Sequence, residues 1–176
     1  MNILLTGGSA CGKSTYAEKL ISTLENEHRY YIATMRPYDD ECIKKIERHR
    51  KQRESGRFIT IEQPVSIGSL ILPHRGTALL ECMCNLCANE MFDESGNMRD
   101  PFDDIINGIE KLKAQCRHLI VVTNDVGGEY SAEYDSTTNA YIQTLGALNA
   151  HLASDFDCVY ELVCSIPLVL KGELLI

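Results

Sequence analysis

The segment Gly7-Gly8-Ser9-Ala10-Cys11-Gly12-Lys13-Ser14 fits the pattern G-x-x-x-x-G-K-S/T and decides the fold of this chain. An apolar run, Ile3-Leu4-Leu5, comes directly before it. After it, Tyr16, Leu20 and Leu24 recur at the spacing of one helix face. A buried strand, a glycine-rich turn and a helix in this order predict a phosphate-binding loop.

Each part of this motif has a chemical task in binding a triphosphate. The glycines let the backbone curl so that N–H groups point into one concavity, and the following helix adds its positive end. We expect Lys13 to reach the β and γ phosphates as a catalytic cation, and the Ser14 hydroxyl to bind Mg²⁺. The motif therefore predicts a site for ATP or GTP with Mg²⁺. Its expected residues are Gly7, Gly8, Ser9, Ala10, Cys11, Gly12, Lys13, Ser14 and Thr15.

Short apolar runs alternate with helical patterns along the rest of the chain. The expected strands are residues 3–5, 30–34, 77–80, 119–122 and 158–163. The expected helices are residues 14–26, 39–54, 82–92, 101–116 and 133–153. Because parallel neighbours need crossover connections, this alternation predicts an α/β fold with a mostly parallel sheet and helices on both faces. A final run, residues 166–170, follows Val163 after only two residues, so we expect an antiparallel C-terminal edge strand.

The composition is that of one globular domain and argues against a nucleic-acid-binding protein. The 176 residues, 44% hydrophobic and 24% charged, predict a single P-loop nucleotide-binding domain over residues 1–176. The net charge of -8 opposes binding to DNA or RNA, because phosphate neutralisation needs a surplus of Lys and Arg. There is no apolar run of about 18 residues that would span a membrane. The phosphate loop begins at residue 7 with no leader pattern before it, so we expect a cytoplasmic protein.

Eight cysteines occur in the chain, and we expect free thiols because no secretory signal accompanies them. Cys82, Cys84 and Cys87 form a C-x-C-x-x-C cluster. Small packed side chains explain this cluster. The alternative is a zinc or iron–sulfur site, for which no fourth ligand lies at a familiar spacing.

Two acidic residues follow expected strands at the edge where ligands of open α/β sheets gather. Glu81 comes directly after residues 77–80, where a P-loop protein holds the water shell of its metal ion, so we expect it to bind Mg²⁺. Asp125 follows residues 119–122 and occupies the equivalent place on another strand. The alternative for each is a solvated loop carboxylate.

His49 lies within a basic stretch, because seven of the 17 Lys and Arg residues fall between positions 44 and 57. On the expected helix over residues 39–54 it shares a narrow stripe with Cys42, Ile46 and Arg53. A neutral imidazole beside cations is a competent nucleophile toward phosphorus. A packed structural histidine would occupy the same stripe, so the residues alone leave both roles open.

A set of residues spread over nearly the whole chain matches a known family in order and spacing. These residues are Gly7-Gly8, Tyr31-Ile32-Ala33-Thr34, Asp40-Glu41, Ile46, His49, Arg53, Thr60-Ile61-Glu62, Leu79-Leu80-Glu81-Cys82, Asn89, Val122-Thr123-Asn124-Asp125-Val126-Gly127, Gly146, Asn149 and Ile166-Pro167-Leu168. In them the chain resembles the bifunctional adenosylcobinamide kinase/adenosylcobinamide-phosphate guanylyltransferases of cobalamin biosynthesis.

The resemblance implies a RecA-like P-loop fold that assembles as a homotrimer, with each active site close to a subunit boundary. It implies that a nucleoside triphosphate phosphorylates the aminopropanol hydroxyl of adenosylcobinamide. GMP from GTP is then transferred through a GMP–histidine intermediate to give adenosyl-GDP-cobinamide. The histidine that matches is His49, and Glu62 and Glu81 match positions that bind the nucleotide.

Two other functions stay open at this stage. The first is a P-loop kinase for another small hydroxyl substrate, without guanylyl transfer and with a structural His49. The second is a nucleotide-dependent switch or assembly protein, although the Asn-Lys-x-Asp motif that recognises guanine is absent from the sequence. For the kinase reaction, Asp40, Glu81 and Asp125 are all candidates for the general base.

Overall fold

A computed structural model of the chain describes residues 1–24, 28–36, 58–93, 95, 97–126 and 134–176. The expected helix over residues 39–54, with Asp40 and His49, lies outside the described residues. All statements below on contacts and burial refer to the described part of the chain.

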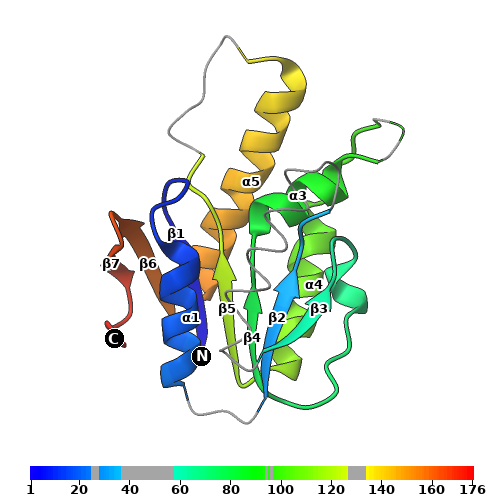
Figure 1. Cartoon of the computed structure of the whole chain (residues 1–176). Coiled ribbons are helices and arrows are strands. Elements are labelled where there is room, and N and C mark those ends of the chain that lie inside the picture. The colour runs from blue at the N-terminus through cyan, green and yellow to red at the C-terminus, as the bar shows by residue number, and fades with distance from the viewer. Residues whose placement is uncertain (25–27, 37–57, 94, 96, 127–133) are drawn as a thin grey trace.

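The described strands form one seven-stranded sheet in the order β3-β2-β4-β5-β1-β6-β7 (Figure 1). The strands are β1 (Asn2–Thr6), β2 (Arg29–Ala33), β3 (Ile59–Glu62), β4 (Thr77–Leu80), β5 (His118–Val122), β6 (Cys158–Val163) and β7 (Ile166–Lys171). All neighbours pair in parallel except β6 and β7, which pair antiparallel at the edge. The prediction of a mostly parallel sheet with an antiparallel C-terminal edge strand is therefore confirmed.

Helices cover both faces of this sheet, as predicted. They are α1 (Lys13–Thr23), the short 3₁₀ helix η2 (Ile67–Ser69), α3 (Met83–Met91), α4 (Phe102–Gln115) and α5 (Ser136–Asp155). Helix α1 packs on one face, and α3, α4 and α5 pack on the other (Figure 1). Within the described residues, no helix has the length and apolar character needed to cross a membrane.

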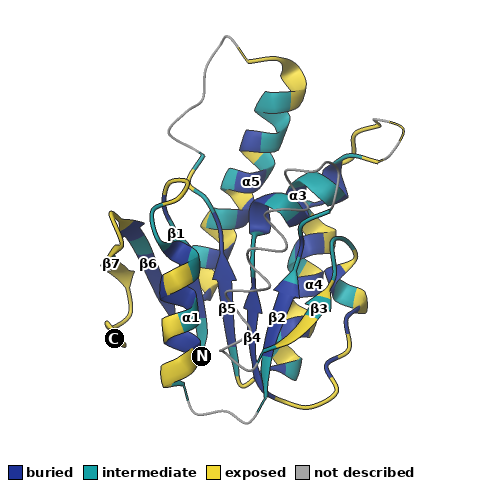
Figure 2. Cartoon of the chain, in the orientation of Figure 1, coloured by how far each residue is buried: buried dark blue, intermediate teal, exposed yellow. Residues whose placement is uncertain are grey.

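Strand β1 shows why both faces are covered. Successive side chains of a strand point to opposite faces. Ile3 and Leu5 pack with α1, whereas Leu4 packs with the cluster around α3, α4 and α5, and all three side chains are buried. In Figure 2, which colours buried residues dark blue, β4 is dark along its length and β5 is dark except at its first residue. Continuous apolar runs such as residues 3–5 are thus required by a sheet that is buried on both sides.

Local signals set the ends of the helices on the second face. Asp135 caps α5, since its carboxylate accepts a hydrogen bond of 2.7 Å from the Thr138 N–H. Helix α4 carries Asp103 and Asp104 in its first turn and Lys113 in its last, which complements the helix dipole. The observed helix ends lie within three residues of the predicted ones.

Strand β3 was not predicted from its pattern of residues. It is an edge strand that pairs only with β2, and three of its four residues are exposed. Such a strand needs no apolar run, because only Ile61 packs against the core. The sequence Ile59-Thr60-Ile61-Glu62 therefore lacks the signal that marks the central strands.

The central strands should carry most of the stability. Leu119→Ala in β5 removes a fully buried side chain, so we expect the free energy of unfolding to fall by about 2–5 kcal/mol. Ile71→Ala, at a side chain that is 82% exposed, is the matched control and should change it by less than about 0.5 kcal/mol. Urea unfolding at equilibrium measures both values, and equal effects would contradict this description of the core.

Candidate nucleotide-binding site

The segment from Gly7 to Gly12 forms a tight loop between the carboxyl end of β1 and the start of α1. Gly7 and Gly12 have φ values of 134° and 98°, which residues with a side chain rarely adopt. Ala10 also has a positive φ of 57°. The glycines of the motif are thus required by the backbone path itself.

Close packing gives a second reason for these glycines. A Cβ atom on Gly7 would lie 2.6 Å from the Leu162 carbonyl oxygen, and one on Gly12 would lie 2.4 Å from Ser165 Oγ. Both contacts come from the β6–β7 hairpin, whose turn residues Cys164 and Ser165 have φ values of 50° and 66°. The backbone N–H of Ser165 donates to the Cys11 carbonyl at 2.9 Å. This hairpin therefore supports the loop from the side.

Lys13 lies over the loop as the first residue of α1. Its side chain is only 7% exposed, and its Nζ donates to the Gly7 carbonyl at 2.9 Å and also to the Gly8 carbonyl. The N–H of Tyr16 donates to the Gly12 carbonyl, so the helix begins directly at the loop. The lysine and the amino end of α1 are therefore held at the loop, and a glycine-rich loop followed by a helix N-terminus is an arrangement that binds phosphate groups.

The other predicted residues of the loop differ in exposure. Gly8, Ser9, Ala10 and Thr15 are exposed, whereas Cys11 and Ser14 are half-buried. The exposed stretch leaves the outer backbone of the loop accessible to a ligand.

The three acidic residues lie at different distances along the same edge of the sheet. Asp125 follows β5, which pairs with β1, and its N–H donates to the Gly7 carbonyl at 3.3 Å. Glu81 follows β4, one strand further, and is half-buried. Glu62 ends β3, four strand positions from β1 or about 19 Å. The structure thus brings Asp125 to the loop, places Glu81 two strand positions from β1, and leaves Glu62 at four.

A set of hydrogen bonds fixes the backbone between β5 and Asp125. Thr123 Oγ1 donates to Asn149 Oδ1 at 2.7 Å, and Asn149 Nδ2 donates to the Asn124 carbonyl at 3.0 Å. The N–H of Asn124 donates to Cys84 Sγ at 3.4 Å. No sequence pattern marks these positioning contacts, since they join α3, the end of β5 and α5.

Cys84 has a distinctive environment within the cysteine cluster. Hydrogen bonding from Cys82, and further from the Asn124 N–H, lowers the pKa of the Cys84 thiol to about 6, although burial opposes this shift. Burial raises the pKa of Cys87 to about 12. Cys84 and Cys87 are buried, as expected for packed side chains, whereas Cys82 is half-buried. All seven cysteines in the described part of the chain are free thiols.

The strand–loop–helix geometry, the buried lysine and the acids at the carboxyl edge define a P-loop nucleotide-binding protein. The family described as "Cobinamide kinase / cobinamide phosphate guanyltransferase" matches residues 3–170, and the chain belongs to this family. It is therefore a nucleotide-dependent kinase and guanylyltransferase of cobalamin biosynthesis, as the resemblance implied.

Two curated relatives agree with this assignment. Both are named "Bifunctional adenosylcobalamin biosynthesis protein CobU". The protein of Escherichia coli (strain K12) is 32% identical over 97% of this chain and 100% of its own length. The protein of Salmonella typhimurium (strain LT2) is 31% identical with the same coverage.

A solved structure supports the RecA-like P-loop fold. It is the flagellar accessory protein FlaH from Methanocaldococcus jannaschii, with a TM-score of 0.52 over 98% of this chain and 78% of that chain. Its sequence identity is 13%, so this similarity concerns the fold alone. Together with the strand order, it confirms the predicted fold class.

Gly12 and Gly8 make a matched pair for testing the loop. Gly12→Ala combines a positive φ with the contact to Ser165, so we expect the free energy of unfolding to fall by at least about 1–2 kcal/mol. A Cβ on Gly8 meets no atom within 4 Å, so Gly8→Ala should change it by less than about 0.5 kcal/mol. Chemical denaturation of both variants without nucleotide measures the difference. A stable Gly12→Ala protein would show that the loop does not need the backbone path described here.

Proposed function

We propose that this chain phosphorylates the aminopropanol hydroxyl of adenosylcobinamide and then transfers GMP from GTP to give adenosyl-GDP-cobinamide. The observation that carries the proposal is the loop at residues 7–14, with Lys13 buried over it, in a chain that matches its family over residues 3–170. The family supports this pair of reactions over a kinase for another small hydroxyl substrate.

In the first reaction, the loop amides and Lys13 bind the phosphates of ATP or GTP. The substrate hydroxyl oxygen attacks the γ-phosphorus, and the bond to the β-phosphate oxygen breaks. We propose that Ser14 and Glu81 hold Mg²⁺, since Ser14 lies in the first turn of α1 and Glu81 follows β4 at the same edge of the sheet, two strand positions from β1. Asp125 is a suitable general base, because its backbone bonds directly to the loop.

In the second reaction, we propose that His49 is the nucleophile. Its imidazole nitrogen attacks the α-phosphorus of GTP and pyrophosphate leaves. A phosphate oxygen of the phosphorylated corrinoid then attacks the same phosphorus, and the phosphorus–nitrogen bond breaks. This role rests on the family resemblance, because His49 lies outside the described residues. Glu62 and Glu81 are proposed to bind the nucleotide along the carboxyl edge of β3 and β4.

We also propose that the enzyme works in the cytoplasm as a homotrimer. Exposed apolar side chains on the edge strand β7, among them Ile166, Leu168 and Leu170, are consistent with a surface that another subunit covers. The corrinoid is the proposed substrate partner, and nucleic acid is not.

The covalent step can be tested directly. GTP labelled in its α-phosphate should leave acid-labile, base-stable label on the wild-type protein, and His49→Ala should abolish that label, because a phosphorus–nitrogen bond is the species formed. Denaturing electrophoresis after acid or base treatment measures the label.

His151→Ala is the matched control, since His151 is an exposed histidine on α5. It should be labelled like the wild type. Label that persists in His49→Ala would remove His49 from the mechanism. Phosphorylation of cobinamide without any label in the wild type would favour a kinase that lacks guanylyl transfer.

A further inference from the structure

The turn after β5 carries the exposed carboxylate of Asp125 on a backbone that is fixed by its neighbours. The N–H of Thr123 donates to the Leu5 carbonyl of β1 at 2.9 Å, and the N–H of Asp125 donates to the Gly7 carbonyl at 3.3 Å. Asp125 is exposed, whereas Val126 after it packs against the core. A fixed backbone below an accessible side chain is the arrangement that a catalytic group needs, since its geometry is then set before the substrate binds.

Asn149 on α5 makes two hydrogen bonds to this turn. Its Nδ2 donates to the Asn124 carbonyl at 3.0 Å, and its Oδ1 accepts from Thr123 Oγ1 at 2.7 Å. A carbonyl oxygen only accepts hydrogen bonds, so the amide of Asn149 faces it with nitrogen, and the hydroxyl of Thr123 then donates to the amide oxygen. The pair of bonds requires a donor and an acceptor on one side chain, which an amide provides and a carboxylate does not.

The peptide group between Asn124 and Asp125 joins α5 to the phosphate loop. Its C=O accepts from Asn149 and its N–H donates to Gly7, so both of its polar atoms have partners on other segments. Because a peptide group is planar, these two bonds fix the direction in which the chain enters Asp125. The Gly7 carbonyl also accepts from Lys13 Nζ at 2.9 Å. A continuous path of hydrogen bonds therefore runs from α5 to the lysine of the loop.

We propose that Asn149 is a positioning residue for phosphoryl transfer, which holds the Asp125 carboxylate in place relative to the phosphate loop. This inference rests on the proposed function, in which Asp125 accepts the proton of the substrate hydroxyl. A displacement of a reacting group by about 1 Å can lower a rate about a hundredfold, so loss of the bond to the preceding peptide should slow the reaction. Phosphate binding should depend on Asn149 much less, because the N–H of Ser165 supports the loop independently at Cys11.

Asn149→Asp tests this role, because it keeps the size of the side chain and the acceptor for Thr123 but places an oxygen against the Asn124 carbonyl. We expect kcat for phosphorylation of adenosylcobinamide to fall about tenfold or more, while KM for the donor, ATP or GTP, stays within about twofold. Thr123→Val removes the bond that orients the amide and should lower kcat in the same way. Thr123→Ser keeps the hydroxyl and should retain the kcat of the wild type. Steady-state kinetics with both substrates varied measures these values.

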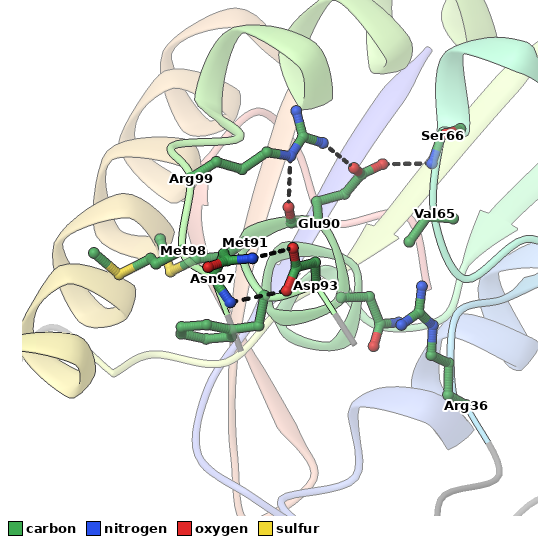
Figure 3. A pocket seen from close by; sticks show the side chains of 11 residues that line it. Arg36, Val65, Ser66, Glu90, Met91, Asp93, Asn97, Met98 and Arg99 are labelled. Carbon is green, nitrogen blue, oxygen red and sulfur yellow. Dashed lines mark hydrogen bonds and ion pairs between the residues drawn. The ribbon is translucent and has the colours of Figure 1, made fainter. Parts of the chain in front are cut away.

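Asn97→Asp is the matched control, since it is the same substitution at a similar bond. Asn97 Nδ2 donates to Asp93 Oδ2 at 2.9 Å in the exposed turn after α3, beside the turn that follows β3 (Figure 3). The new oxygen again lies against an acceptor, but at the other end of the sheet from the phosphate loop. We therefore expect kcat and both KM values to stay within about twofold of the wild type. Urea unfolding shows that each variant is folded at the temperature of the assay.

A folded Asn149→Asp protein with the kcat of Asn97→Asp would overturn the positioning role and leave Asn149 a part of the fold alone. A rise in the nucleotide KM of Asn149→Asp, with kcat unchanged, would also overturn it and assign the contact to support of the loop. If Asn149→Asp does not fold, equal kcat values in Thr123→Val and Thr123→Ser would overturn the role instead. A wild type that does not phosphorylate adenosylcobinamide would overturn the proposed function, and this inference with it.

Discussion

Parallel pairing of β1 with β5 on one side and β6 on the other is the constraint on which the candidate site depends. Leu4 pairs in register with Val121 and Val159, so three carboxyl ends meet at one edge of the sheet. The loop that follows β1 is thereby placed between the Asp125 turn and the β6–β7 hairpin. Hydrogen bonds from Asp125 N–H to Gly7 and from Ser165 N–H to Cys11 join all three segments.

This arrangement explains how an acidic protein can bind a polyanion. The net charge of -8 repels a triphosphate at long range, so affinity must come from local groups. In our proposal, oriented amides at the start of α1 and the ammonium group of Lys13 are the local groups that supply it. Mg²⁺, held by Ser14 and Glu81 in our proposal, would neutralise further charge at the same edge.

The strongest signals in the sequence come from residues that are close to one another along the chain. The loop motif lies between an apolar run and a helical pattern, so its place in the fold was predictable. The antiparallel edge strand followed from the two residues, Cys164 and Ser165, that separate it from β6. In contrast, the strand order depends on which crossover passes over which neighbour, and periodicity carries no information on this choice.

Contacts between distant residues were the part that the sequence did not reveal. Ser165 and Cys11 are 154 residues apart, and nothing in either neighbourhood marks their contact. The same holds for Asn149, which supports the β5 turn from α5. Strand β3 lacked an apolar run because it is an exposed edge, and the expected helix with His49 lies outside the described residues.

The central claim is that the phosphate loop and Lys13 bind a nucleoside triphosphate. Calorimetric titration of GTP with magnesium, into the wild type and into Lys13→Ala, tests it most directly. The account predicts saturable heat for the wild type and no measurable heat for Lys13→Ala at the same concentrations. The wild-type heat reports phosphate binding by the loop, and the variant lacks its only side-chain cation within the motif. Absence of heat from well-folded wild-type protein, or equal affinity in the variant, would contradict it.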